Sequence, residues 1–163
     1  RGNVNSRLEK LANNEFDAII LAAAGLIRLG FSDQITAFMD VEQSLPAIGQ
    51  GAVGIECRQN DPEIAALLTP LHDTATALRI RAERALNQRL HGGCQVPIAG
   101  FALLNKGQIR LRGMVGQPDG KRIIRAEKTG SSQNPEELGR AVAEDLLAQG
   151  ADKILAELDI YPE

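Results

Sequence analysis

The chain has 163 residues, of which 44% are hydrophobic and 24% are charged, and its net charge at pH 7 is −3. These values are close to those of ordinary globular proteins and exclude a largely disordered chain. The acidic pI near 5.5 and the absence of tryptophan argue against a nucleic-acid-binding protein, which needs a basic surface and aromatic stacking platforms.

The apolar segments and the cysteines indicate the compartment. The longest apolar run, residues 18–27, is shorter than the roughly 20 residues that a membrane-spanning helix needs, so no membrane span is expected. Two cysteines are too few for a disulfide framework and favour a reducing, cytoplasmic compartment. The sequence starts at Arg1 without a methionine or signal peptide, so we expect it to be a piece of a longer protein.

The first part of the chain is typical of α/β structure. Asn3 can cap a short helix. Residues 18–24 form an uninterrupted apolar run, which predicts a strand buried on both faces of a parallel sheet. A second strand is expected through residues 53–57, with Cys57 in the core, and Asp61 followed by proline predicts the start of another helix.

Residues 73–163 indicate a small α+β domain. Asp73 can cap a long helix that runs to about Leu90. Three antiparallel strands and two further helices follow in the pattern. The strands are expected over residues 98–104, 108–115 and 122–128, and the helices are expected to open at Asn134 and Ala151.

The first part also contains a glycine-rich segment, residues 43–54. Its three glycines imply a close approach of backbone to backbone or to a ligand. The spacing matches neither the dinucleotide fingerprint nor the P-loop.

Three arginines are candidates for binding an anion. Arg1 and Arg7 flank a helix start, and Arg28 follows the predicted buried strand, where ligands of open α/β sheets collect. The guanidinium group suits carboxylates or phosphates because it makes paired hydrogen bonds and keeps its charge. Each of these arginines could equally be a solvated surface residue.

Cys94 is the strongest candidate for chemistry. It follows two glycines at the end of the long helix, where an open thiol is suited to attacking or carrying a group. Gly92 suits the left-handed position that ends a helix. A buried structural cysteine is the alternative. His91 could activate the thiol, although a histidine at a helix C-terminus is a simpler account. Neither histidine has a Cys/His spacing that predicts a metal site.

Taken alone, these residues leave two functions open. One is an α/β module that binds a small anion reversibly, with an unreactive Cys94. The other is a cysteine-dependent acyl-transfer enzyme, in which His91 activates Cys94. Rapid alkylation of Cys94 at neutral pH would favour the second.

Four segments, in order and in register, closely resemble the C-terminal half of the porphobilinogen deaminases, also called hydroxymethylbilane synthases. The segments are Arg1–Leu8, Asp17–Leu26, Leu45–Glu56 and Gly92–Pro97. The resemblance implies two periplasmic-binding-protein-like α/β domains, present in part, followed by a small domain of three antiparallel strands packed with helices. It assigns residues 1–45 to domain 2, residues 46–72 to a return into domain 1, and residues 73–163 to domain 3.

The resemblance also implies a function. The family condenses four porphobilinogen molecules into hydroxymethylbilane, with release of ammonia, on a dipyrromethane primer. The match makes Cys94 the thioether attachment site, and Arg1, Arg7, Arg28 and Gln50 contacts for cofactor or substrate. The family's catalytic aspartate would precede Arg1, so no catalytic residue is assigned here and the chain alone is expected to be inactive. The complete enzyme is expected to be a cytoplasmic monomer.

Overall fold

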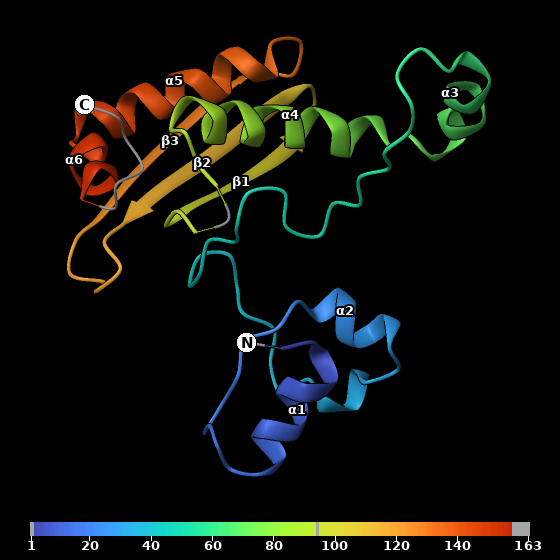
Figure 1. Cartoon of the computed structure of the whole chain (residues 1–163). Coiled ribbons are helices and arrows are strands. Elements are labelled where there is room, and N and C mark those ends of the chain that lie inside the picture. The colour runs from blue at the N-terminus through green and yellow to red at the C-terminus, as the bar shows by residue number, and fades with distance from the viewer. Residues whose placement is uncertain (1, 94, 158–163) are drawn as a thin grey trace. The chain divides into compact units, whose positions relative to one another are not determined.

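The structure, a computed structural model, describes residues 2–93 and 95–157 (Figure 1). The chain divides into two compact units at Ser44, and each unit is described by itself. The mixture of helices with one antiparallel sheet confirms the predicted combination of secondary structures. The three predicted domain boundaries remain a prediction.

The first unit contains helices with a very small core. The elements are α1 (Val4–Ala12), α2 (Ala23–Arg28) and the 3-10 turn η1 (Ser32–Gln34). Asn3 caps α1 as predicted, since its Oδ1 accepts a hydrogen bond from the Ser6 N–H at 2.9 Å. Among the described residues of this unit, Leu26 alone is buried.

Two predicted strands are not formed. Residues 18–22 are extended without pairing, residues 23 and 24 begin α2, and Ile20 is 72% exposed. Residues 52–58 are also extended and exposed, so the prediction that Cys57 lies in the core is wrong. A strand is stable only when a neighbouring strand takes its backbone hydrogen bonds, and no described residue pairs with either segment in a sheet.

The second unit contains the sheet. Its elements are α3 (Pro62–Leu68), η2 (Thr69–Leu71), α4 (Thr74–Arg89), β1 (Ile98–Asn105), β2 (Gln108–Gly116), β3 (Ile123–Ser131), α5 (Pro135–Ala148) and α6 (Ala151–Ala156). The strands are antiparallel in the order β1-β2-β3. The predicted long helix, the three strands and the two final helices are confirmed.

Local sequence signals explain where these elements begin and turn. Asp61 and Asp73 cap α3 and α4 by accepting hydrogen bonds from backbone N–H groups three residues further on. The β1–β2 turn places Lys106 and Gly107 at φ 46° and 76°, the geometry of a two-residue hairpin. Gly150 has a φ of 91° and separates α5 from α6.

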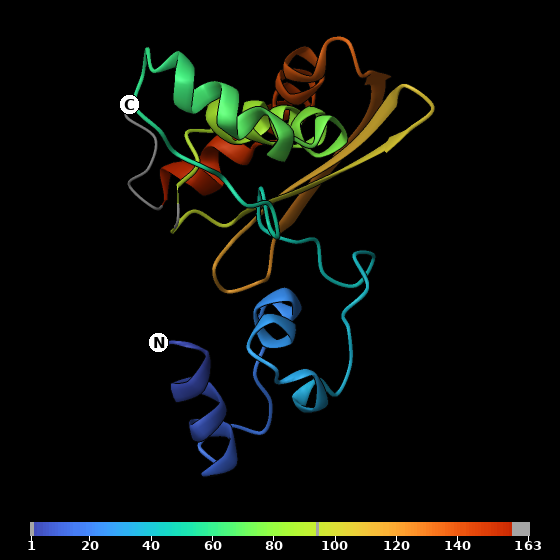
Figure 2. The ribbon, with the colours of Figure 1, turned by 90° about the vertical axis from the view of Figure 1, so that its right-hand side faces the viewer.

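Helices α4 and α5 lie side by side on one face of the sheet (Figures 1 and 2). Leu86 of α4 is fully buried against Gly100 and Gly113, which pair across β1 and β2 and leave room for it. The two helices approach closely at Gly139, where an added Cβ would lie 2.7 Å from the Ala85 Cβ. The packing against α5 and the sheet fixes the position of α4. Residues of α4 in turn contact the loops of the candidate site.

Candidate functional site

Glu83, in the middle of α4, is the one buried charged residue in the part of the chain that the structure describes, at 4% exposure. Its Oε2 accepts a hydrogen bond from the Gly49 N–H and its Oε1 accepts one from the Ala102 N–H, both at 2.8 Å. Burial raises the pKa of the carboxyl group, and the two backbone hydrogen bonds oppose this rise. Glu83 therefore joins a loop, a helix and a strand.

The segment before Gly49 lies along the outer edge of β1. The Gly100 N–H donates to the Pro46 carbonyl at 3.1 Å. Gly100 lies two residues before Ala102, whose N–H donates to Glu83. The Ile48 side chain packs on the core and occupies the space where Gly100 would carry a Cβ. An added Cβ at Gly49, Gly51 or Gly54 would meet nothing within 4 Å, so the prediction that these glycines mark a close approach of backbone to backbone is wrong.

The second loop begins at the C-terminus of α4. His91 has the left-handed φ of 52°, so the prediction that Gly92 takes this position is wrong. Gly92 is needed for space instead, because an added Cβ would lie 2.7 Å from the Asn87 Cγ. The Gly92 N–H donates to the backbone carbonyl of Asn87 at 2.8 Å, and the side-chain Nδ2 of Asn87 donates to the backbone carbonyl of Gly92 at 3.3 Å. The Val96 N–H closes a turn onto the Gly93 carbonyl at 3.1 Å.

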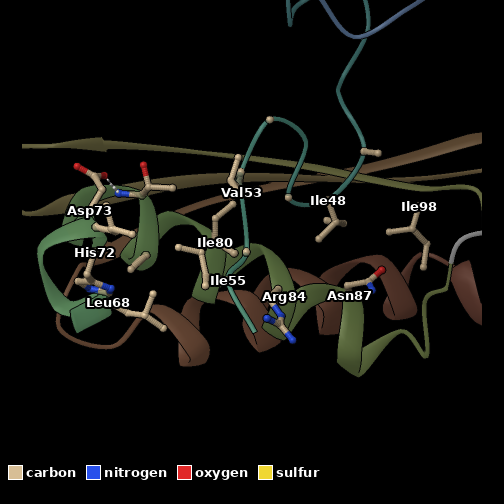
Figure 3. A pocket seen from close by; sticks show the side chains of 18 of the residues that line it. Ile48, Val53, Ile55, Leu68, His72, Asp73, Ile80, Arg84, Asn87 and Ile98 are labelled. Atoms are coloured by element: carbon tan, nitrogen blue, oxygen red, sulfur yellow. Dashed lines mark hydrogen bonds between the residues drawn. The ribbon is translucent and has the colours of Figure 1, made fainter. Parts of the chain in front are cut away.

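Both loops border one groove of about 1080 Å³ in the second unit. In Figure 3 the groove lies between the loop that brings Ile48 and Val53 and helix α4, which brings Arg84 and Asn87. Its other wall residues include Gly49, Ile55, Leu68, His72, Ile80, Gly93 and Ile98. The groove is therefore mainly apolar, with the exposed Arg84 guanidinium as a cation on its wall.

The structure places three of the five predicted site residues. In the first unit, Arg7 is half-buried, and its Nη2 donates to the Ile20 carbonyl at 3.0 Å, while Arg28 is exposed in the last turn of α2. In the second unit, Gln50 is exposed in the turn directly after Gly49. Arg1 and Cys94 lie outside the described residues. Their roles stay predictions.

Sequence reasoning missed three residues of the groove region. No role in binding is predicted from the sequence for Glu83, Arg84 or Asn87. A signal for Glu83 existed, since it lies directly after Ala82 and three residues before Leu86 on the apolar stripe of the helix. Its hydrogen-bond partners are 34 and 19 residues away and could not be read from local spacing.

Residues 2–93 and 95–157 contain neither a cluster of metal ligands nor a membrane-spanning helix. No three His, Cys, Asp or Glu side chains lie close enough together to hold a metal ion. No helix in these ranges has both the length and the apolar character that crossing a bilayer requires.

The chain matches two protein-family models. Residues 1–66 match the dipyrromethane cofactor-binding domain of porphobilinogen deaminase, and residues 77–148 match the C-terminal domain of the same enzyme. Both models describe one class of tetrapyrrole-synthesising enzymes, and together they cover most of the chain. The chain therefore belongs to the porphobilinogen deaminase family, which confirms the resemblance seen in the four segments. Dipyrromethane as the cofactor of the matched domain is also confirmed.

The groove has the chemistry that a dipyrrole needs. A dipyrromethane derived from porphobilinogen presents flat apolar rings and several carboxylates. The groove offers apolar walls from Ile48, Val53 and Ile80 and a guanidinium group from Arg84. Its volume of about 1080 Å³ lies just above the range of roughly 300–1,000 Å³ that is usual for small-molecule sites. Because the carboxylate Asp73 also lines the groove, the apolar walls and the single guanidinium of Arg84 are the features that match the cofactor.

Proposed function

We propose that the chain is part of a transferase that condenses four porphobilinogen molecules into hydroxymethylbilane and releases ammonia at each addition. The single observation that carries this proposal is the match of both family models, in order, along the chain. The groove beside the Gly92 loop supports it, because its lining suits a carboxylate-bearing pyrrole chain.

The proposed roles of the predicted site residues follow from the resemblance. Cys94 holds the dipyrromethane through a thioether bond. Arg1, Arg7 and Arg28 bind carboxylates of the cofactor and the growing chain, and Gln50 contacts the same ligands. Arg84 joins this set because it lines the groove next to the loop that leads to Cys94. An arginine suits each of these tasks, since it keeps its charge and makes paired hydrogen bonds.

The chemistry is divided between cofactor and protein. When bound, dipyrromethane supplies the pyrrole carbon to which the first substrate is added. The residues of this chain bind the carboxylates, hold the thiol in place and shield the pyrroles on the apolar walls. Turnover also needs the family's catalytic aspartate, which the resemblance assigns to no residue of this sequence. We therefore expect no ammonia release from the 163-residue chain alone.

The cellular setting is proposed on chemical grounds. The few cysteines favour a reducing, cytoplasmic compartment, and the acidic pI argues against binding of nucleic acid. The resemblance implies that the complete enzyme is a monomer.

The test is a mass measurement on Cys94. The complete protein is purified from the cells that make it, denatured, and mapped by peptide mass over residues 92–97. We expect an added dipyrrole on Cys94 and an unmodified Cys57, which serves as an exposed control thiol in the same chain. Bare Cys94 in the complete, active protein would overturn the proposal, and so would reversible porphobilinogen binding without ammonia release.

A further inference from the structure

We propose that Glu83 and Asn87 form a positioning pair on α4. This pair holds two loops at fixed places along the groove: the loop that contains Gly49 (the Gly49 loop) and the loop that contains Gly92 (the Gly92 loop). The importance of the pair for catalysis rests on the proposed function, which assigns Gln50 and Cys94 to these loops. The holding of the loops does not depend on that assignment, because it is carried by contacts among described residues.

Glu83 fixes the first loop through its two carboxylate oxygens. An ionised carboxylate only accepts hydrogen bonds, and each oxygen here takes one backbone N–H, from Gly49 and from Ala102. Because Ala102 is fully buried in β1, the sheet acts as a rigid reference for the loop. The contact of Ile48 with Gly100 adds a second point of attachment. Gln50 follows Gly49 directly, so its backbone position is set by this anchor.

Asn87 fixes the second loop. It lies four residues after Glu83, so both side chains emerge on the same side of α4. The side-chain Nδ2 of Asn87 and its backbone carbonyl both form hydrogen bonds with Gly92. The Cγ of Asn87 occupies the space where any other residue at position 92 would carry a Cβ. The backbone that leads into Gly93 is therefore held against the helix.

The two anchors share one rigid support. Leu86, between them in sequence, is fully buried in the core, so α4 cannot shift without disturbing the sheet. Arg84 and Asn87 line the groove, as do Gly49 and Gly93 of the loops. Because Glu83 and Asn87 lie about one turn apart on α4, the helix sets the distance between the two loops that they bind.

The first test uses Glu83→Gln. A glutamine has one carbonyl oxygen and one NH2 group, so it can accept from only one of the two N–H donors. We expect one of the two N–H groups, Gly49 or Ala102, to exchange with solvent about ten-fold faster or more, as for loss of a hydrogen bond to a charged acceptor. The Gly92 N–H and the core N–H of Leu111 should be unchanged. Glu137→Gln, at an exposed position in α5, is the charge-matched control. Equal exchange of both Gly49 and Ala102 in the two variants would overturn the role of Glu83.

The second test uses Asn87→Ala, with the exposed neighbour Gln88→Ala as control. Asn87→Ala keeps the backbone carbonyl that binds the Gly92 N–H and removes the Nδ2 group that donates to the Gly92 carbonyl. We expect the released loop to give faster alkylation of Cys94 relative to Cys57 in the same sample, with unchanged exchange of the Gly49 and Leu111 N–H groups. A general loss of stability would instead speed the exchange of these two amides as well. An unchanged thiol ratio, or faster exchange at Gly49 and Leu111, would overturn the role of Asn87.

A measurement on the unaltered chain keeps the proposal testable if a variant fails to fold. The Gly49 and Ala102 amide protons should shift with one common pH midpoint, since both bind the same carboxylate. Burial places this midpoint above the ordinary glutamate value, while the nearby positive charge of Arg79 lowers it somewhat. Separate midpoints would overturn the role of Glu83. Bare Cys94 in the complete enzyme, with these amide results as expected, would instead remove the proposed function and leave the positioning role intact.

Discussion

Residues 18–24 and residues 98–104 are both apolar runs of seven residues, but only the second is a strand. Ile20 is 72% exposed, whereas Ala102 is fully buried. The difference lies in the partners. The strand β1 meets β2 through a two-residue turn, so its partner is local in sequence. The first run has no partner among the described residues, and an apolar pattern without a neighbouring strand does not form a sheet.

The largest expected contrast is between Leu86→Ala and Ile20→Ala. Leu86 is fully buried, so its truncation should lower the free energy of unfolding by about 2–5 kcal/mol. Ile20→Ala removes an exposed side chain and should change it by less than about 0.5 kcal/mol. Urea unfolding followed by circular dichroism measures both. Similar losses in the two variants would show that the first unit has a core that its exposure does not reveal.

Two helical glycines give the next contrast. An added methyl group at Gly139 would lie 2.9 Å from the Leu86 backbone nitrogen, so Gly139→Ala should destabilise the chain by about 1–3 kcal/mol. At Gly25 in α2 nothing lies within 4 Å, and Gly25→Ala should stabilise by up to about 1 kcal/mol through helix propensity. Thermal unfolding compares them, and destabilisation by both changes would contradict the difference in packing.

The helix caps give a smaller, pH-dependent contrast. The hydrogen bonds from Thr76 lower the pKa of Asp73 below its ordinary value of 3.8. A lowered pKa means that the ionised cap stabilises the fold above pH 3.8 and that this contribution is lost as the pH falls through the lowered value. The difference in Tm between the unaltered chain and Asp73→Asn should therefore shrink on acidification. Asn3 caps α1 without a charge, and Asn3→Ala should show no such trend.

The smallest effect is expected at the surface of the packed layer. The Arg81 Nε and Glu136 Oε1 are 2.6 Å apart between α4 and α5, and both side chains are largely exposed. Water screening limits such a pair to roughly 0.2–1 kcal/mol. A double-mutant cycle with Arg81→Met and Glu136→Gln should give a coupling energy in this range that falls with added salt. A coupling above about 2 kcal/mol would show that solvent screens this ion pair less than its exposure implies.

The features that the sequence predicted are local ones. The caps Asn3, Asp61 and Asp73 bind backbone groups three residues away, and the turn at Lys106 sets the pairing of β1 with β2. The family could also be recognised, because the resemblance rests on four sequence segments and their order, which can be read without a structure. The features that the sequence did not predict are long-range. The partners of Glu83 lie on two other segments, and the exposure of Cys57 follows from the lack of a partner strand.

The segment that runs along β1 has a consequence for self-association. An exposed sheet edge offers free N–H groups to which another copy of the chain can add a strand. Here the Gly100 and Ala102 N–H groups are already bound, by Pro46 and by Glu83. The chain therefore blocks this edge with its own backbone and one carboxylate. Replacing Glu83 should not only loosen a loop but also open a site for edge-to-edge polymerisation, which would show as turbidity that rises with protein concentration.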